Sequence, residues 1–347
     1  MEDTMRALIL TKNQEIELRT TFPIPQIKEG FVLVKVKRAG ICASDIGYWK
    51  HGGANLQLPV ILGHEVSGII VDAGDTSFSK GSRVFLTNDF YLCGECRFCK
   101  SGNNNMCIGR RSIGSKENGG FAEYILAPKG IVRIIPEGMS FEEAAYLEVL
   151  ACGVHAIVNQ AKVKVNDLVF VSGPGAIGLS AALTAKAMGC RVVLGGLSQD
   201  IHRLQIAQGL GIDYVVDISQ ENLAEIIHDL SDGYGADITV EAAGVYPSLQ
   251  TCFELTRKRG TCVEMGVLHG TSTIDLSVVM FKELIFTGSY AKNERDWIIA
   301  RDLVALNRVE VGPMISDIMS LEDYEKAFDK SIRTDCFKIM FDPELRN

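Results

Sequence analysis

The sequence predicts an α/β protein of two domains: one is mostly β, and the other is built on a doubly wound parallel sheet. Three observations support this expectation: a length of 347 residues, short β-type runs in the N-terminal part, and a regular alternation of strands and helices after about residue 165. Domains usually contain about 100–200 residues, so two are expected here. We place them at residues 1–150 and 151–287, with residues 288–347 as a C-terminal segment.

The N-terminal part contains β-branched and aromatic runs separated by turn residues, a pattern that is typical of strands. These runs are FVLVKVK at 31–37, GIIVD at 68–72, RVFL at 83–86 and FAEYILA at 121–127. Their frequency predicts the mostly-β domain.

From about residue 165 strands and helices alternate, which predicts a parallel sheet covered on both faces. The expected strands are 168–172, 191–194, 214–216, 237–242 and 261–265, and the expected helices are 177–188, 202–210 and 221–230. Pro247 opens a further helix that is expected to end near Gly260. After residue 288 we expect helices at 296–306 and 321–330, the second with Ser320 as N-cap, and a final strand at 336–341.

The composition excludes several functional classes. Hydrophobic residues make up 47% and charged residues 22% of the chain, which is typical of a globular protein with an ample core. The net charge of −8 disfavours nucleic acid and anionic membranes as partners. Residues 168–185 carry no charge and match a membrane span in length, but Gly173-Pro174-Gly175 would break a spanning helix, so we interpret them as buried core.

The strongest motif is Cys93-Gly-Glu-Cys96-Arg-Phe-Cys99, followed by Cys107. Four thiolates within 15 residues, with glycines nearby to turn the backbone, can close a tetrahedron around one soft divalent ion. Gaps of two residues suit metal ligands and are poor geometry for a disulfide. The motif therefore predicts a zinc site in which the protein supplies all four ligands, and such a site is structural.

A second set of possible ligands is dispersed along the chain: Cys42, His64, Glu65 and Glu148. A catalytic zinc needs three protein ligands and one exchangeable position, and cysteine, histidine and carboxylate are suitable donors. Spacing alone does not diagnose such a site, because a lone cysteine is usually a core residue and a His-Glu pair usually belongs to a turn or a surface. From spacing alone, the set is only a hypothesis.

A GxGxxG motif spans Gly173 to Gly178 and includes Gly175, Ala176 and Ile177. It follows an apolar strand and opens a helix, which is the context that dinucleotide binding requires. The glycines permit a tight turn and a close approach of backbone N–H groups to a pyrophosphate, and the helix N-terminus supplies positive potential. The motif thus predicts an NAD(P) site.

The residues that end the next strand bear on the choice between NAD and NADP. NAD sites usually place an acid there for the ribose 2′-hydroxyl, but this chain has Gly196, followed by Ser198 and Arg203. The missing carboxylate removes repulsion against a 2′-phosphate, which a hydroxyl and a cation could hold. NADP is therefore favoured, although Asp200 could serve as the ribose acid, or the protein could accept both cofactors.

Together these three motifs resemble the zinc-containing medium-chain dehydrogenase/reductase family, part of the alcohol dehydrogenase superfamily, over nearly the whole chain. The resemblance implies a GroES-like, mostly-β catalytic domain, an inserted Rossmann coenzyme domain, and a C-terminal segment that completes the first domain. It also implies two zinc ions per chain, one structural and one catalytic. Cys42, His64 and Glu65 would hold the catalytic zinc, and Glu148 would contact it directly or through water.

Within the family, residues 42–52 look most like polyol (sorbitol-type) dehydrogenases, which share an SD..YW.HG pattern. The run that begins at Glu148 and includes His155 is similar to a stretch of the same enzymes. By this resemblance Ser44 would contact the reacting oxygen and pass its proton outward. Tyr48 would line the substrate pocket.

Two positions depart from the polyol pattern. Gly47 stands where many relatives have a relay histidine, so water or another group such as His51 must carry the proton outward. Ser289 stands where sorbitol dehydrogenases carry an arginine that contacts the substrate, and it is the residue expected in that pocket here.

The resemblance implies an enzyme that oxidises a secondary alcohol, most similar to a polyol, to the ketone with hydride transfer to nicotinamide C4. An L-threonine 3-dehydrogenase-like amino-alcohol oxidoreductase has the same parts and is the nearest alternative. A non-catalytic dinucleotide-binding sensor, keeping only the four-cysteine zinc, is an alternative of another class. Family members are often homodimers or homotetramers, and thiolate metal sites without a secretory signal predict a cytoplasmic protein.

Overall fold

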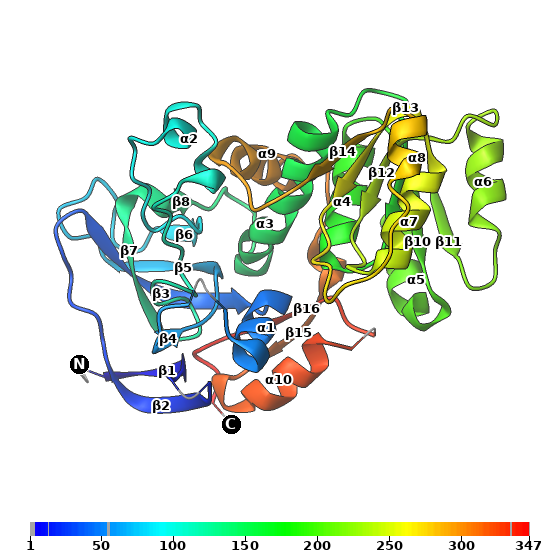
Figure 1. The fold of residues 1–347 in the computed structure, drawn as a ribbon. Helices are drawn as coiled ribbons and strands as arrows, with labels where there is room; N and C mark the ends of the chain where they lie inside the picture. Colours follow the sequence, from blue (N-terminus) through cyan, green and yellow to red (C-terminus); the bar gives the residue numbers. More distant parts are fainter. Residues whose placement is uncertain (1–3, 13, 54–55, 334, 347) are drawn as a thin grey trace. The chain divides into compact units, whose positions relative to one another are not determined.

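The computed structural model describes residues 4–12, 14–53, 56–333 and 335–346, and it divides the chain into two compact units. The first unit contains the chain up to Glu148 together with the residues from Val311 onward, and the second is Val149–Glu310. The end of the chain therefore returns to the N-terminal unit. In Figure 1 the red elements near the C-terminus lie beside the blue elements near the N-terminus.

The first unit is mostly β. Its strands are β1 (Thr4–Leu10), β2 (Ile16–Pro23), β3 (Phe31–Gly40), β4 (Val60–Ile61), β5 (Glu65–Asp72), β6 (Arg83–Leu86), β7 (Tyr124–Pro128), β8 (Val132–Ile134), β15 (Ile315–Met319) and β16 (Lys338–Phe341). Its helices are α1 (Ala43–His51), α2 (Arg97–Lys100), α10 (Tyr324–Ser331) and the first part of α3 (Phe141–Val154).

Two sheets organise this unit. A three-stranded sheet has the order β2-β1-β4, and a seven-stranded sheet has the order β15-β16-β3-β5-β6-β8 with β7 also paired to β3. The pairing of β3 with β5 is antiparallel and sets Gly40 opposite Glu65. Strand β16 lies on the other side of β3 and pairs Met340 with Gly40. This register places the ends of β3 and β16 next to the start of β5.

Aromatic packing explains why the C-terminal segment belongs to this unit. Phe328 of α10 and Phe341 of β16 are both buried, and the ring of Phe341 lies edge-on to that of Phe121 at a centroid distance of 4.9 Å. Phe328 contacts Trp49 of α1 at 5.5 Å. Burying an aromatic side chain typically contributes about 1.5–3 kcal/mol, so the core of this unit is incomplete without the C-terminal residues.

The second unit is built from alternating strands and helices. Its strands are β9 (Leu168–Ser172), β10 (Arg191–Gly196), β11 (Tyr214–Asp217), β12 (Ala236–Glu241), β13 (Thr256–Glu264) and β14 (Ile285–Gly288). Its helices are α4 (Ala176–Ala187), α5 (Ile201–Gly209), α6 (Leu223–Leu230), α7 (Tyr246–Leu255), α8 (Ser277–Phe281) and α9 (Glu294–Ala305). A π-helical segment, His155–Ala161, continues α3 into this unit.

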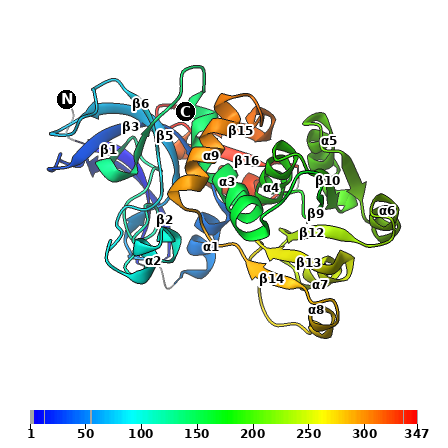
Figure 2. The same cartoon turned by 90° about the horizontal axis from the view of Figure 1, so that it is seen from above.

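These strands form one parallel sheet with the order β11-β10-β9-β12-β13-β14. Figure 2 shows α4 on one side of the strands and α7 and α8 on the other. The order is that of a doubly wound Rossmann sheet, in which strands are added on one side of the first strand, β9, and then on its other side. The predicted fold class, a mostly-β domain plus a doubly wound parallel sheet, is confirmed.

Two boundaries differ from the expectation. Helix α9 was expected in the C-terminal segment, but the unit boundary lies at Glu310/Val311, because Asp296 and Trp297 of α9 are buried in the second unit. The helix opened at Pro247 ends at Leu255 instead of near Gly260. Lys282 binds the carbonyl oxygens of Phe253 and Thr256 at 3.2 and 2.9 Å, which closes the helix and lets β13 start at Thr256.

No helix within the described parts of the chain is long and apolar enough to cross a membrane. The uncharged stretch flagged in the sequence is split between strand β9 and helix α4, and it forms part of the buried core of the parallel-sheet unit.

Candidate active site and metal centres

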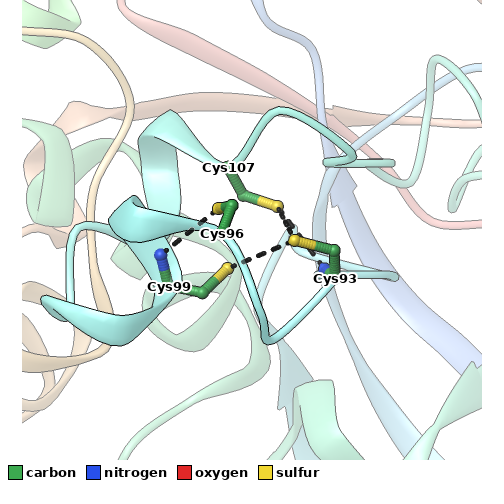
Figure 3. Close-up of side chains that lie close together, drawn as sticks. All are labelled: Cys93, Cys96, Cys99 and Cys107. Atoms are coloured by element: carbon green, nitrogen blue, oxygen red, sulfur yellow. Dashed lines mark hydrogen bonds between the residues drawn. The ribbon is translucent and has the colours of Figure 1, made fainter.

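The three cysteines of the CxxCxxC motif and Cys107 lie together in a lobe between β6 and β7. Their sulfur atoms are all within 4.8 Å of one another. Figure 3 shows them grouped around one centre, with Cys93 Sγ 3.5 Å from Cys107 Sγ and 4.0 Å from Cys99 Sγ. All four are free thiols. The donor set therefore fits a tetrahedral thiolate site for zinc.

Backbone hydrogen bonds shape this lobe before any metal binds. Cys96 is the N-cap of α2, and its sulfur accepts the N–H of Cys99 at 3.5 Å. This N–H lowers the pKa of Cys96 to about 6, so its sulfur is largely thiolate at neutral pH. Burial and the neighbouring sulfur of Cys107 raise the pKa of Cys99 to about 12. A divalent cation would relieve this competition by keeping all four sulfurs deprotonated.

The dispersed set also converges, in the first unit. Cys42 Sγ, a ring nitrogen of His64 and a carboxylate oxygen of Glu65 lie within 4.8 Å of one another. The pairing of β3 with β5 explains this convergence, because Cys42 follows the end of β3 and His64 precedes the start of β5. Three donors of this kind suit a zinc ion that keeps a fourth position for substrate.

Asp45, which the sequence analysis did not assign, organises this site. It is fully buried, and its carboxylate accepts the N–H groups of Cys42 at 2.9 Å and Gly63 at 3.3 Å. Its Oδ1 also lies 3.5 Å from Nδ1 of His64. A carboxylate behind one ring nitrogen orients the other nitrogen toward a metal.

Charges around the site shift the pKa values of His64 and Cys42 in opposite directions. Burial of the His64 ring opposes protonation, but the Asp45 carboxylate outweighs it and raises the pKa of His64 well above its usual value. For Cys42, burial raises the pKa, while the hydrogen bond and charge of His64 lower it to a net value below that of an ordinary thiol. The thiolate form that a metal requires is thus favoured at Cys42.

Glu65 is fully buried and is paired with a lysine from the distant C-terminal segment. Lys338 Nζ lies 2.6 Å from Glu65 Oε1 and also donates to the carbonyl oxygen of Ile41 at 2.9 Å. Burial lowers the pKa of Lys338, but the Glu65 charge outweighs burial and raises it. Glu65 Oε2 is buried and has no hydrogen-bond partner among the described residues, which leaves it available as a metal ligand.

Position 40 has to be glycine for this arrangement. A Cβ atom there would lie 1.9 Å from Glu65 Oε2. Lys338 itself could have been flagged in the sequence, because it interrupts an apolar strand (Cys336-Phe-Lys-Ile-Met-Phe341), where an unpaired charge would be costly.

Replacing Lys338 with methionine tests this pair. Removing one partner of a buried ion pair leaves an uncompensated charge, so we expect the free energy of unfolding to fall by about 3–5 kcal/mol. Urea denaturation of the purified variant measures it. Lys330→Met is the matched control, because its pair with Asp317 is partly exposed and should contribute less than about 1 kcal/mol. Equal stability of both variants would contradict the assignment.

Glu148 lies beside the same site. It is 5% exposed, and its Oε1 accepts Asn88 Nδ2 at 2.7 Å and stands 3.9 Å from His64 Nε2. The structure thus brings all four predicted residues together, with Glu148 next to His64 and with Cys42, His64 and Glu65 as the tighter group. Asn88, which sequence reasoning missed, orients the Glu148 carboxylate.

Ser44 and Tyr48 are both on α1, whose N-cap is Cys42. Ser44 is exposed in the first turn, one turn before the partly buried Tyr48. Residues four apart share a helix face, so both follow Cys42 on one side of α1. Trp49 packs on Phe328 in the core, which makes it a packing residue.

In the second unit the GxGxxG motif forms the turn between β9 and α4. Gly173 has a φ of +105°, and a Cβ there would lie 2.7 Å from the backbone nitrogen of Ala243. A Cβ at Gly178 would lie 2.0 Å from the Gly173 carbonyl oxygen. Gly175 is the N-cap of α4, with Ala176 and Ile177 in its first turn, and a Cβ at Gly175 would meet open space. The turn can therefore admit a pyrophosphate at the helix N-terminus.

The expected 2′-phosphate site lies at the end of β10. A side chain at Gly196 would meet Pro174 at 2.7 Å, which explains why no acid stands there. Asp200 is buried and caps the turn through the N–H of Leu197 at 3.1 Å, and it lies 3.6 Å from Arg203.

A carboxylate that sequence reasoning missed lies at the end of the neighbouring strand β11. Asp217 Oδ2 accepts the hydroxyl of Ser198 at 2.7 Å, and this hydrogen bond lowers the pKa of Asp217. The parallel register pairs Asp217 with Gly196, which is what brings its charge to Ser198. Ser289 follows β14 in the same unit, with its N–H bonded to the carbonyl oxygen of Glu264 at 2.8 Å.

Comparison with known proteins identifies the family. Residues 28–137 match the alcohol dehydrogenase GroES-like domain, and residues 176–305 match the zinc-binding dehydrogenase domain. The D-arabitol-phosphate dehydrogenase of Enterococcus avium is 36% identical over 323 residues, which cover 92% of each protein. The chain belongs to the zinc-binding alcohol dehydrogenase family.

Further relatives are similar over nearly the whole chain. The sorbitol dehydrogenase of Halalkalibacterium halodurans is 35% identical over 326 residues, covering 92% of this chain and 94% of the relative. An L-threonine 3-dehydrogenase of Rhizobium johnstonii is 29% identical over 99% of both. A solved zinc-binding dehydrogenase of Sinorhizobium meliloti bound to NADP superimposes with a TM-score of 0.89, at 31% identity over 98% of this chain and 99% of that one.

The predicted family and fold are thereby confirmed, and the chain is a zinc-binding, NAD(P)-linked oxidoreductase of the alcohol dehydrogenase type.

Proposed function

We propose that this dehydrogenase oxidises a secondary hydroxyl group of a polyol to the ketone and transfers the hydride to NAD(P). The observation that carries the proposal is the convergence of Cys42, His64 and Glu65, with Asp45 and Lys338 holding two of these donors in place. The two relatives with identities of 36% and 35%, named for D-arabitol phosphate and sorbitol, support a sugar alcohol as the substrate class.

Two zinc ions per chain fit the donor sets. The four-cysteine lobe would hold one, and its fully protein-supplied ligands leave no position for substrate. Cys42, His64 and Glu65 would hold the other. The buried Oε2 of Glu65, which has no hydrogen-bond partner in the described part of the chain, supports its assignment as the third ligand. Glu148 is held by Asn88 and lies adjacent to His64. It would then contact the zinc at its exchangeable coordination position, directly or through water.

Each group in the site has a distinct task. Zinc, when bound, supplies the Lewis acidity that lowers the pKa of an alcohol oxygen, and nicotinamide supplies the hydride acceptor. Asp45 keeps His64 oriented, while Lys338 holds the Glu65 carboxylate in place. The exposed hydroxyl of Ser44 accepts the proton of the substrate hydroxyl by hydrogen bond.

The proton then needs a route to solvent. Gly47 has no side chain that could carry it. His51 ends α1 two turns after Ser44, on the same face of the helix, and is exposed. We assign the outward transfer to His51 together with solvent water.

NADP is the proposed preferred cofactor. Position 196 has no acid, Ser198 is an exposed hydroxyl, and the guanidinium of Arg203 is held at this edge by Asp200. The NADP bound to the Sinorhizobium meliloti relative supports the same cofactor. Asp217 opposes the preference, because its ionised carboxylate lies 2.7 Å from the Ser198 hydroxyl.

Replacing Arg203 with alanine should change cofactor choice more than catalysis. Loss of one cation near a 2′-phosphate is expected to lower the ratio of kcat/KM for NADP+ over that for NAD+ by about tenfold, or ~1.4 kcal/mol. Initial rates with both cofactors measure this ratio. Arg191→Ala is the control, since Arg191 opens the same strand β10 at its opposite end. An unchanged ratio in Arg203→Ala would assign the discrimination to Asp217 and Asp200 instead.

A homodimer is the proposed assembly. Strand β14 forms one edge of the parallel sheet, and Ile285 and Phe286 on it are 60% and 40% exposed, next to the exposed Met280 and Phe281 of α8. Exposed apolar edge strands readily pair with another chain, and a second copy would cover this one symmetrically. Sedimentation velocity measures the oligomeric state.

The reduced thiolate sites support a cytoplasmic location.

The experiment that tests the proposed function combines metal content with substrate turnover. Zinc per chain is measured by mass spectrometry, and NAD+ and NADP+ reduction is assayed with sugar alcohols, their phosphates and L-threonine. Two zinc ions with polyol-dependent reduction are the expected result. Turnover of L-threonine alone would shift the assignment to the amino-alcohol alternative. Gly47 and Ser289, the two departures from the polyol pattern, are compatible with that alternative. One zinc and no turnover of any alcohol would indicate the sensor.

A further inference from the structure

A cysteine and a lysine that have no part in the proposed reaction lie in contact in the second unit. Lys292 Nζ donates to Cys152 Sγ at 3.5 Å. Cys152 lies near the end of α3, and Lys292 lies just before α9. The cysteine is half-buried and is a free thiol, whereas Lys292 is only 4% exposed.

The position of the lysine is set by its own segment. Ala291, directly before it, has a φ of +53°, a left-handed conformation that residues with a side chain rarely adopt. The ammonium group lies over the ring of Trp297, 5.2 Å from its centroid. A cation–π contact of this kind holds the amine on a fixed side of α9.

A buried His-Asp pair ties this segment to the helix that carries the cysteine. Asp296 Oδ2 accepts the N–H of Asn293 at 2.7 Å and lies 2.8 Å from Nδ1 of His155. Asn159 of the π-helical segment donates to the other oxygen of the same carboxylate. Asn293 follows Lys292 directly, and His155 is three residues after Cys152. These hydrogen bonds therefore connect the segment that carries Lys292 to the helix that carries Cys152, close to both residues.

The cysteine also has little freedom to move away. The next residue, Gly153, packs so closely on α4 that a Cβ there would lie 2.6 Å from the backbone carbon of Ser180. Because both backbones are fixed, only side-chain rotation separates or joins Cys152 Sγ and Lys292 Nζ. The sulfur and the nitrogen are thus held at a distance from which a bond can form without rearrangement of the fold.

We propose that Cys152 and Lys292 form a reversible covalent cross-link when the protein meets a peroxide. Hydrogen peroxide oxidises the thiol to a sulfenic acid: an S–O bond forms, the peroxide O–O bond breaks, and water is released. The Lys292 amine, after giving one proton to solvent, attacks the sulfur. An S–N bond forms, the S–O bond breaks, and the oxygen leaves as a second water. Two molecules of a thiol reductant reverse the reaction and become a disulfide.

The test is peptide mapping of the purified, zinc-loaded protein after exposure to a few equivalents of hydrogen peroxide. The expected product joins the tryptic peptides that contain Cys152 and Lys292, with the mass of their sum less two hydrogen atoms and no cleavage after Lys292. Dithiothreitol should abolish the product. Because the readout is mass, it does not depend on any substrate being turned over.

Matched variants separate this cross-link from other oxidation. Cys152→Ser and Lys292→Arg should both lose the joined peptides, and Lys292→Arg keeps the positive charge over Trp297. Cys190→Ser should retain them, because burial raises the pKa of Cys190 to about 12 and its sulfur contacts no lysine amine in the described structure. If the wild-type protein yields no peptide that joins Cys152 to Lys292, the proposal is wrong.

A different product would overturn it as well. Cys152 that gains two or three oxygen atoms in the wild-type protein, without joining Lys292, has escaped capture by the amine. A joined peptide between Cys152 and another cysteine would assign the oxidation to a disulfide. Either result shows that the contact of 3.5 Å is not reactive.

Discussion

Cys42→Ala should abolish alcohol oxidation while leaving the protein folded. The substitution removes one of three donors from the Cys42, His64 and Glu65 set, so we expect kcat/KM to fall by a factor of at least about 1,000, or ~4 kcal/mol of transition-state stabilisation. Zinc content should fall by one ion per chain. The melting temperature should stay within about 4 °C of wild type, because a half-buried thiol contributes only roughly 1 kcal/mol.

Three measurements on the same preparation decide this prediction: steady-state rates, metal analysis and a thermal melt followed by circular dichroism. Cys336→Ala is the control, since Cys336 is a buried cysteine of the same unit that belongs to neither metal cluster. Turnover retained by Cys42→Ala protein that has been verified to contain no zinc in this site would refute the catalytic assignment.

Cys96→Ser should have the opposite effect, a large loss of stability with little change in chemistry. The lobe between β6 and β7 has few buried apolar side chains of its own, and none of the residues in α2 is buried. A structural zinc contributes its binding free energy directly to folding. We expect the melting temperature to drop by about 10 °C or more, equivalent to several kcal/mol in a chain of this size.

Activity per folded molecule of Cys96→Ser should remain within a few fold of wild type at a temperature well below its melt. Comparison of this variant with Cys42→Ala provides the control, because each removes a single cysteine from one of the two sites. A variant of Cys96 that keeps its melting temperature and loses turnover would mean that the roles of the two sites are reversed.

Local patterns allowed much of this molecule to be predicted. The ligands of the four-cysteine lobe lie within 15 residues, so chain connectivity alone forces the sulfurs near one another. The turn between β9 and α4 is similar, because the positive φ at Gly173 and the close packing at Gly178 are properties of six consecutive residues. The predicted strands at 83–86 and 168–172 match β6 and β9 residue for residue.

What failed were features that depend on partners distant in the chain. The helix opened at Pro247 ends early because Lys282, far along the chain, binds the carbonyl oxygens at its end. Helix α9 belongs to the second unit because Asp296 is bound to His155, a contact over 141 residues. Neither sequence periodicity nor composition carries information about such contacts.

The sequence by itself determined the family and the fold class, from patterns along the whole chain, and the four-cysteine lobe and the coenzyme-binding turn, from residues close together in the chain. The family resemblance implied that Cys42, His64 and Glu65 meet, but only the tertiary structure decided that Asp45, Asn88 and Lys338 hold them and Glu148 in position. Lys338 lies 273 residues from Glu65. The reason is physical: a buried carboxylate requires a compensating cation, but the strand register of β16 on β3, set by core packing, determines which cation reaches it.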